Sequence, residues 1–504
     1  MSTIRRQSII SSVIVYSGFA LGAVNTLLYG RGLAPDEYGL ITGIFISVGN
    51  IMFAVANPGA VAYISKFYPY YHDHLPAREN DLISRALFFS LVCFALVTLG
   101  GIVFKPLIIR KFGHNSAELV HYYYWIFPFA LGLTLFSVLE AYAWQVKASV
   151  VTSYLREFQW RVFNLVLIVL LFLGVLTNFS VFVKSYAFTY LLLALILFFY
   201  LYSKGHLHLT FSVSRVTKKF RRKIRALMLL TWSGAVLFNL SFFFAAIVIA
   251  AVVPAGLTAV GIFALAQNIA SFIQAPQRAI AAASLGPLSR AWKDKDIGRI
   301  QRIYSRSSIN QVIFSVGMFV LIALNFRDGI LTLGFKQDYL AGLPIFLIIG
   351  LTRIVDMGTG VNTQIIVTSV YWRFEFISGM ILMTLTIPLN YLLARQMGVV
   401  GPAIADLVTF SVYNAIRGIF LYRRFNLQPF NRNTIYTLLL GAGTFASGYW
   451  LFHRHQGFIW LVLRSTAVIV LYVAGVVLLR LSDDIGPVWN TVKKRLGLAG
   501  TRTP

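Results

Sequence analysis

Apolar runs of about twenty residues constrain the fold of this sequence more than any other feature. As a helix, each run is long enough to cross a hydrocarbon layer of about 30 Å. The chain is 58% hydrophobic and 12% charged, which is too apolar for a soluble protein of this length. We therefore predict an all-α integral membrane protein with about 14 transmembrane helices. The expected spans lie near residues 9–30, 38–62, 84–104, 118–140, 159–177, 181–202, 227–252, 258–283, 308–325, 339–361, 375–394, 399–421, 434–452 and 458–480.

The positions of Lys and Arg predict how the chain is oriented. If the N-terminus is cytoplasmic, the cytoplasmic segments hold roughly 70% of the 44 basic residues, as cytoplasmic loops usually do. We therefore expect both termini to be cytoplasmic. The densest basic run, Lys204–Arg225, either lies on anionic lipid headgroups or gathers an anionic substrate. Topology and membrane lipids account for the formal net charge of +27, so no nucleic-acid partner is required.

One segment of the sequence is repeated. The segment GIFISVGNIMFAVANPG, Gly43–Gly59, returns as GIFALAQNIASFIQAPQ, Gly261–Gln277. The copies fall in the second and eighth spans, an even number of crossings apart, so both cross the membrane in the same direction. Such parallel repeats predict two six-helix lobes related by an axis along the membrane normal. The proline near the end of each copy is expected to bend its helix.

This repeat defines the expected organisation of the chain. We expect an N-lobe of helices 1–6, a basic cytoplasmic linker, a C-lobe of helices 7–12, and a last part with helices 13 and 14 and a cytoplasmic tail. These parts cover residues 1–203, 204–226, 227–424 and 425–504 respectively. Because the chain already contains an internal duplication, we expect a monomer.

The first loop carries the most informative local motif. It reads YGRGLAPDEYGLITGIF, Tyr29–Phe45, and resembles the polysaccharide exporters of the multidrug/oligosaccharidyl-lipid/polysaccharide superfamily. Within that superfamily it most resembles the Wzx-type O-antigen flippases of the bacterial inner membrane. The resemblance implies a MATE-like fold and an alternating-access flippase for undecaprenyl-pyrophosphate-linked oligosaccharide in lipopolysaccharide biosynthesis. It also implies polysaccharide polymerases or glycosyltransferases as partners.

Ionisable residues inside the spans are the first candidates for substrate contacts, because burying a charge in hydrocarbon is costly. Arg353 lies about 21 Å from the outer end of the tenth span, at about 1.5 Å per residue, and Asp356 follows on the same helix face. The two side chains either neutralise each other as a structural pair or serve function. In the second case Arg353 meets a pyrophosphate or an acidic sugar, while Asp356 holds Arg353 or takes part in ion coupling.

Three further charges lie nearer the ends of spans. Arg278 and Arg417 either extend to lipid headgroups or engage a pyrophosphate at the cytoplasmic mouth of a lumen. Asp406 is either a cation or proton site or a hydrogen-bonded helix partner. Glu140 ends the fourth span and is expected to be solvated.

Amides within the repeated segment complete the candidate lumen. Asn50 and Asn268 occupy the same position in the two copies, and they either hold helices together or line a polar cavity. Gln274 follows in the second copy and is assigned to the same lumen.

Other chemistry finds little support in the sequence. It contains no Walker-type glycine loop, no nucleophile elbow and no histidine pair with the spacing of a zinc site. We therefore expect no cofactor, no metal and no enzymatic activity. Two transport alternatives stay open: a cation-coupled multidrug exporter of the same fold and a flippase for peptidoglycan-precursor lipid.

Overall fold

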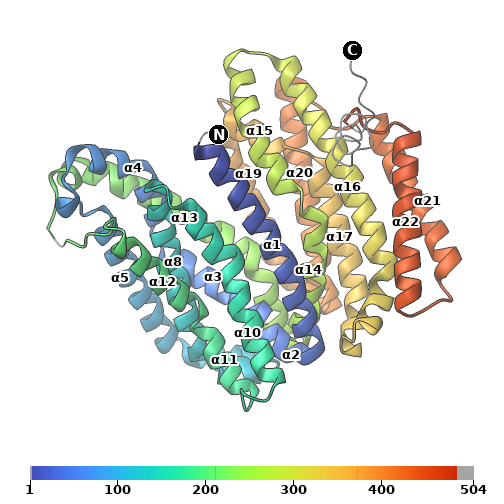
Figure 1. The fold of residues 1–504 in the computed structure, drawn as a ribbon, viewed down its shortest axis with the longest axis horizontal. Coiled ribbons are helices and arrows are strands. Elements are labelled where there is room, and N and C mark those ends of the chain that lie inside the picture. Colours follow the sequence, from blue (N-terminus) through green and yellow to red (C-terminus); the bar gives the residue numbers. More distant parts are fainter. Residues whose placement is uncertain (1–2, 211, 372, 485–504) are drawn as a thin grey trace, which may run out of the picture. The chain divides into compact units, whose positions relative to one another are not determined.

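The computed structural model describes residues 3–210, 212–371 and 373–484 (Figure 1). These residues are predominantly helical and include no strand, which confirms the predicted all-α fold class. The chain divides into two compact units. The first comprises Met1–Leu265 with Ile387–Pro402, and the second Ala266–Thr386 with Ala403–Pro504. The division into N-lobe, linker, C-lobe and tail stays a prediction, and most of the predicted tail lies outside the described residues.

The first unit is built from α1 to α13 around a core in which α8 packs against α3, α5 and α12 (Figure 1). Many of these helices are apolar on every face, as expected for helices that contact lipid on one side and other helices on the other side. The helices are α1 (Thr3–Gly32), α2 (Pro35–Tyr38), the π-helical η1 (Gly39–Phe45), α3 (Ile46–Ala56), α4 (Ala60–His74), α5 (Leu82–Val103), α6 (Lys105–Phe112), α7 (Ala117–His121), α8 (Ile126–Gln145), α9 (Ser149–Ser153), the π-helical η4 (Tyr154–Gln159), α10 (Trp160–Phe172), α11 (Phe179–Ala187), α12 (Thr189–Ser203) and α13 (Arg215–Val252).

The second unit is organised around one long helix, α16, which packs against α15, α17, α21 and α22 (Figure 1). Its helices are α15 (Gln277–Lys293), α16 (Ile297–Thr332), α17 (Gly342–Gly358), α18 (Asn362–Thr368), α21 (Arg432–Phe452) and α22 (Phe458–Leu478). Three helices contribute residues to both units: α14 (Gly256–Ser271), α19 (Arg373–Met397) and α20 (Val400–Phe425).

Thirteen helices among the described residues are long and apolar enough to cross a membrane. They match the predicted spans except for the fifth, near 159–177. There the helix begins ten residues earlier, at Ser149, and it carries three charged residues, Arg156, Glu157 and Arg161. This helix is long enough to cross a membrane, but its three charged residues distinguish it from the thirteen apolar helices.

The charges at this helix correct one expectation. Glu140 is not solvated but buried, with 5% of its surface exposed. Its Oε2 accepts a hydrogen bond of 2.8 Å from Arg156 Nη1. One turn on, Arg161 pairs with Glu157 at 3.0 Å. The position of Glu140 at the end of an apolar helix predicts exposure. The sequence of that helix does not show the partner, because Arg156 belongs to the next helix along the chain.

Both copies of the repeated segment are distorted near their prolines, and the expected bend is a complete interruption of the helix. In the first copy α3 ends at Ala56 and α4 begins at Ala60. In the second, α14 ends at Ser271, a short 3₁₀ turn follows, and α15 begins at Gln277. Proline removes a backbone donor and so favours these breaks.

The start of the second copy packs tightly against the helix that carries the first. A Cβ atom added to Gly261 would lie 1.8 Å from the carbonyl oxygen of Pro35, and one added to Gly39 would lie 2.1 Å from that of Leu257. Because glycine has no side chain, the two backbones can approach to contact distance, as small residues allow in membrane helices. These contacts fix α14 against α2 and η1 within the first unit.

We expect Gly261→Ala to destabilise the protein by about 1–3 kcal/mol, the usual cost of overpacking. The effect should appear as a lower melting temperature of the purified protein in detergent. Gly100→Ala is the matched control, because no atom lies within 4 Å of an added Cβ there. Equal melting temperatures for the two variants would contradict this close approach.

Candidate functional site

The candidate site forms in the second unit, where two helix breaks bring polar groups together. Between α17 and α18 the chain leaves the helix at Thr359–Val361, and Gly360 has a φ of 60°. A Cβ on Gly360 would lie 2.8 Å from Ser307 Oγ, so glycine is required both for the backbone angle and for the space. The freed carbonyl of Gly358 accepts a hydrogen bond from Ser308 Oγ. Non-helical backbone at membrane depth needs such partners.

Asp356, in the last turn of α17, is the centre of this site. Its Oδ2 accepts hydrogen bonds from Gln277 Nε2 at 2.8 Å and from Gln274 Nε2 at 3.2 Å. Its Oδ1 accepts one from Asn414 Nδ2 at 3.2 Å. The donors come from the break before α15, from α15 and from α20, so one carboxylate joins three parts of the chain. No cation among the described residues forms an ion pair with it.

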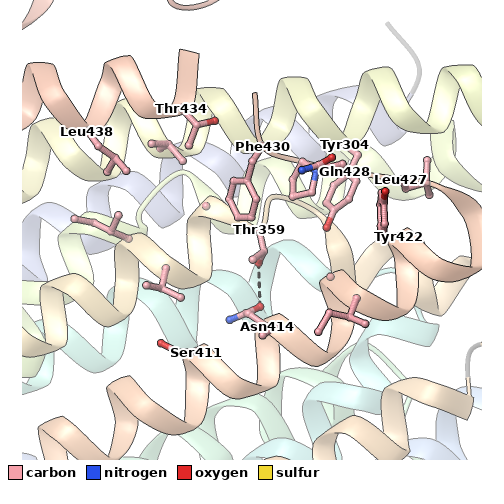
Figure 2. A pocket seen from close by; sticks show the side chains of 18 of the residues that line it. Tyr304, Thr359, Ser411, Asn414, Tyr422, Leu427, Gln428, Phe430, Thr434 and Leu438 are labelled. Carbon is pink, nitrogen blue, oxygen red and sulfur yellow. Dashed lines mark hydrogen bonds between the residues drawn. The ribbon is translucent and has the colours of Figure 1, made fainter. Parts of the chain in front are cut away.

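The network continues from Asn414 to the break after α17. Asn414 Oδ1 accepts hydrogen bonds from Thr359 Oγ1 at 2.9 Å and from Asn362 Nδ2 at 3.0 Å. Figure 2 shows the contact between Thr359 and Asn414 at the edge of a cavity of about 720 Å³. Most of the other lining groups are apolar, including Phe430 and Leu438. A polar network therefore lies beside a space suited to an apolar group.

A second and smaller cavity, of about 190 Å³, is lined by Asp356 itself. Its lining is mostly polar and includes Gln277, Arg278, Gln311 and Asn362. Gln311 is 1% exposed, and neither its Nε2 nor its Oε1 has a hydrogen-bond partner among the described residues. Because unpaired buried polar atoms are costly, this cavity is suited to water or to a polar ligand.

An ion pair between Arg353 and Asp356, which was one of the two alternatives, is not formed. The carboxylate is occupied by amide donors from other helices, although the spacing along α17 would permit the pair. Arg353 is buried, with 9% of its surface exposed, and its side chain makes no hydrogen bond or ion pair with the described residues. It lies within electrostatic range of Asp356 and Asp406.

Arg417 does not extend to lipid headgroups, and that reading is corrected. It is 2% exposed and forms an ion pair with Glu375. Its Nη1 donates to Thr363 Oγ1 at 2.7 Å, and its guanidinium carbon lies 3.9 Å from the centre of the Tyr413 ring. Arg417 thereby ties α20 to α18 and α19.

The remaining candidates are dispersed. Asn50 belongs to the first unit, and its Nδ2 donates to the carbonyl of Ile46 in its own helix at 2.7 Å. Asn268 and Arg278 are exposed, and Asp406 is half-buried in α20. Of the predicted residues, the structure therefore brings together Gln274 and Asp356, with Arg278 beside the same small cavity.

Several residues of this network were not singled out from the sequence: Gln277, Asn414, Thr359, Asn362 and Glu375. Two of them carried a usable signal. Gln277 follows Gln274 by three residues and Asn414 precedes Arg417 by three, a spacing that places each pair on one helix face.

Several solved structures have this architecture. The lipid II flippase MurJ, in an inward closed conformation, aligns with a TM-score of 0.71 at 15% identity, over 94% of this chain and 99% of that one. An inward-facing multidrug resistance MATE family transporter of the MOP superfamily aligns with 0.64 at 15%, over 83% and 98%. A MATE protein in complex with MaL6 aligns with 0.58 at 14%, over 83% and 96%.

The chain has a MurJ/MATE-like transporter fold. This confirms the predicted fold class, and the multi-pass membrane architecture follows from the fold and the apolar helices. At such low identity the likeness establishes the fold and leaves the cargo to other observations. No protein-family model and no curated protein sequence matches the chain.

We expect Glu375→Leu to lower the stability of the protein by roughly 2–4 kcal/mol, because it leaves the buried Arg417 guanidinium without its carboxylate. A lower melting temperature in detergent would report this loss. Arg423→Leu removes an exposed charge near the end of α20, the helix that carries Arg417, and should change the melting temperature little. If the two variants melt alike, the buried ion pair does not support the site.

Proposed function

We propose that this protein is a flippase that moves polyprenyl-pyrophosphate-linked oligosaccharide from the cytoplasmic to the periplasmic leaflet of a bacterial inner membrane. The cargo would serve lipopolysaccharide or O-antigen biosynthesis. The headgroup enters a partly cationic lumen, the polyprenyl tail stays in lipid, and alternating access exposes the headgroup on the other side. No covalent bond changes, so the activity is transport rather than catalysis.

The proposal rests on one observation, the burial of the Arg353 side chain without a hydrogen-bonding or ion-pair partner among the described residues. A guanidinium buried deep in a span, without a hydrogen bond or ion pair among the described residues, keeps its full capacity to bind an anion. Pyrophosphate matches its planar set of donors, and a charge-assisted bond in a low-dielectric site is strong. Arg278, exposed beside the small cavity of the second unit, offers a second donor group.

Asp356 gives the proposal a means of coupling. Its carboxylate accepts three amide hydrogen bonds and has no ion pair, so a proton or a small cation can still bind to it. Asp406 is assigned to the same role because it also lies in electrostatic range of Arg353. Binding of an ion near Arg353 changes the local charge, which links ion binding to anion binding.

The proposed orientation and site of action rest on the sequence, and the proposed partners rest on its resemblance to the Wzx-type flippases. The Lys and Arg distribution favours a cytoplasmic position for both termini. Polysaccharide polymerases and glycosyltransferases are the proposed partners in the membrane, and the internal duplication favours a monomer.

Two other cargoes suit the same fold. A cation-coupled multidrug exporter is favoured by the carboxylate of Asp356, which has no ion pair and could attract an organic cation. A peptidoglycan-precursor lipid would present the same pyrophosphate to Arg353, and the lipid II flippase shares the fold. The cargo is therefore decided by transport assays in which all three are compared.

We expect purified protein in proteoliposomes to move a polyprenyl-pyrophosphate-linked oligosaccharide between leaflets, and Arg353→Ala to slow this by roughly tenfold or more, because a charge-assisted contact is lost. The rate at which the glycan becomes accessible in the opposite leaflet measures the effect. Arg454→Ala, which removes an exposed charge from the loop between α21 and α22, should leave the rate unchanged.

The same vesicles distinguish the alternatives when they are supplied with a peptidoglycan-precursor lipid or a cationic dye. Dye efflux without glycan crossing would identify an exporter. Crossing of the peptidoglycan precursor alone would change the cargo. Equal glycan rates for wild type and Arg353→Ala would refute the role of Arg353.

We expect Asp356→Asn to abolish the part of glycan transport that responds to an imposed proton or sodium gradient, because the amide cannot carry the negative charge that attracts a cation. Rates measured with and without each gradient give this response. The gradient-independent rate should persist. A variant whose gradient response matches that of wild type would exclude Asp356 as the coupling site.

A further inference from the structure

A separate cavity in the first unit has the lining of a lipid-binding site. It measures about 730 Å³, within the usual range of ligand pockets, and lies beside the first turns of α13 and the first half of α5. Four basic residues line it, together with apolar groups of both helices. The basic residues are Arg85, Lys218, Arg221 and Arg225, and the apolar ones include Phe89, Cys93, Met228 and Leu229.

The basic residues that line this cavity outnumber the acidic residues that pair with them. Arg85 pairs with the buried carboxylate of Asp81, at 2.5 Å. The side chains of Lys218, Arg221 and Arg225 make no hydrogen bond or ion pair with the described residues, and all three residues are exposed. Their spacing of three and four residues places them along one face of α13. The cavity therefore presents three uncompensated positive charges.

The wall that carries these charges is held in place by buried hydrogen bonds. Thr217 Oγ1 donates to both oxygens of Asp81, at 3.0 and 2.9 Å, and the backbone N–H of Ser214 donates to Asp81 at 3.2 Å. The hydroxyl of Tyr71 lies 2.7 Å from that of Thr217. Asp81 is 0% exposed. This network joins the start of α13 to α4 and α5. The buried hydrogen bonds therefore fix the position of the helical turns that carry the basic groups.

The helix itself places this cavity at a membrane boundary. α13 has 38 residues and is about 57 Å long at about 1.5 Å per residue, whereas a hydrocarbon core is only about 30 Å thick. Its basic first turns, Arg215–Arg225, precede the apolar stretch that crosses the membrane. A ligand in the cavity would have its polar end near the basic turns and its apolar end beside Phe89 and Leu229, which are exposed.

We propose that this cavity binds a lipid with an anionic phosphate headgroup. The phosphate lies among Lys218, Arg221 and Arg225, and part of the tail lies along Phe89, Met228 and Leu229. A soluble anion would leave the apolar half of the cavity unused, and an uncharged lipid would leave the three cations uncompensated. Two sources offer this chemistry: an anionic phospholipid of the bilayer and an isoprenoid pyrophosphate. The site is distinct from Arg353 and does not depend on the proposed transport activity.

The test compares two charge-matched triple variants of the full-length chain in detergent. Lys218→Gln, Arg221→Gln and Arg225→Gln together remove the cavity charges. Lys219→Gln, Arg222→Gln and Lys223→Gln remove the same charge from the same turns, at residues that do not line the cavity. Native mass spectrometry counts bound phosphatidylglycerol, phosphatidylcholine and polyprenyl pyrophosphate, and melting temperatures verify that both variants fold.

We expect the cavity variant to lose roughly tenfold or more of its bound anionic lipid, while the control variant retains it, because the basic groups near the phosphate carry the attraction. Loss of phosphatidylglycerol binding identifies a bilayer phospholipid as the ligand, and loss of polyprenyl pyrophosphate binding alone identifies the isoprenoid. Equal losses in the two variants, or equal binding of phosphatidylcholine and phosphatidylglycerol by wild type, would overturn the proposal. If the cavity variant does not fold, Arg221→Gln and its control Arg222→Gln give the same comparison with one charge.

Discussion

A polar group inside a hydrocarbon layer has no water to bind, and this constraint governs the structure. It explains why the described residues are almost entirely helical, since a helix satisfies its own backbone groups. It also explains where the helices are allowed to break. At the end of α17 the carbonyl of Gly358 is bound by Ser308, and the side chains of Thr359, Asn362 and Asn414 bind one another. The breaks therefore occur where polar partners have been assembled.

The same constraint separates structural charges from a candidate functional one. Arg464 and Asp328 are both buried and pair at 3.1 Å, Arg417 pairs with Glu375, and Arg161 with Glu157. Each of these arginines is compensated and so is explained by structure alone. Arg353 is also buried, but its side chain has neither a hydrogen bond nor an ion pair among the described residues. An anionic ligand would supply the missing partner, which is why the proposed cargo carries a pyrophosphate.

Much of the fold could be predicted from the sequence because hydrophobic length and proline position act locally. The apolar runs predicted the spans, and Pro276 predicted a bend at the place where the structure has a break between α14 and α15. Side-chain partners were harder to predict because they depend on how different helices pack. Spacing suggested that Arg353 would pair with Asp356, yet donors from α15 and α20 occupy that carboxylate. The expectation that Glu140 is solvated and the alternative that Arg417 extends to lipid headgroups fail for the same reason, since the partners of both residues lie on other helical segments.

We propose above all that Arg353 binds the pyrophosphate of an isoprenoid-linked cargo. The most direct test is equilibrium binding of an isoprenoid pyrophosphate and of the isoprenoid alcohol of the same length to the purified protein and to Arg353→Ala. We expect wild type to prefer the pyrophosphate and Arg353→Ala to bind the two ligands with similar affinity. A preference for the pyrophosphate that survives in Arg353→Ala would contradict the account.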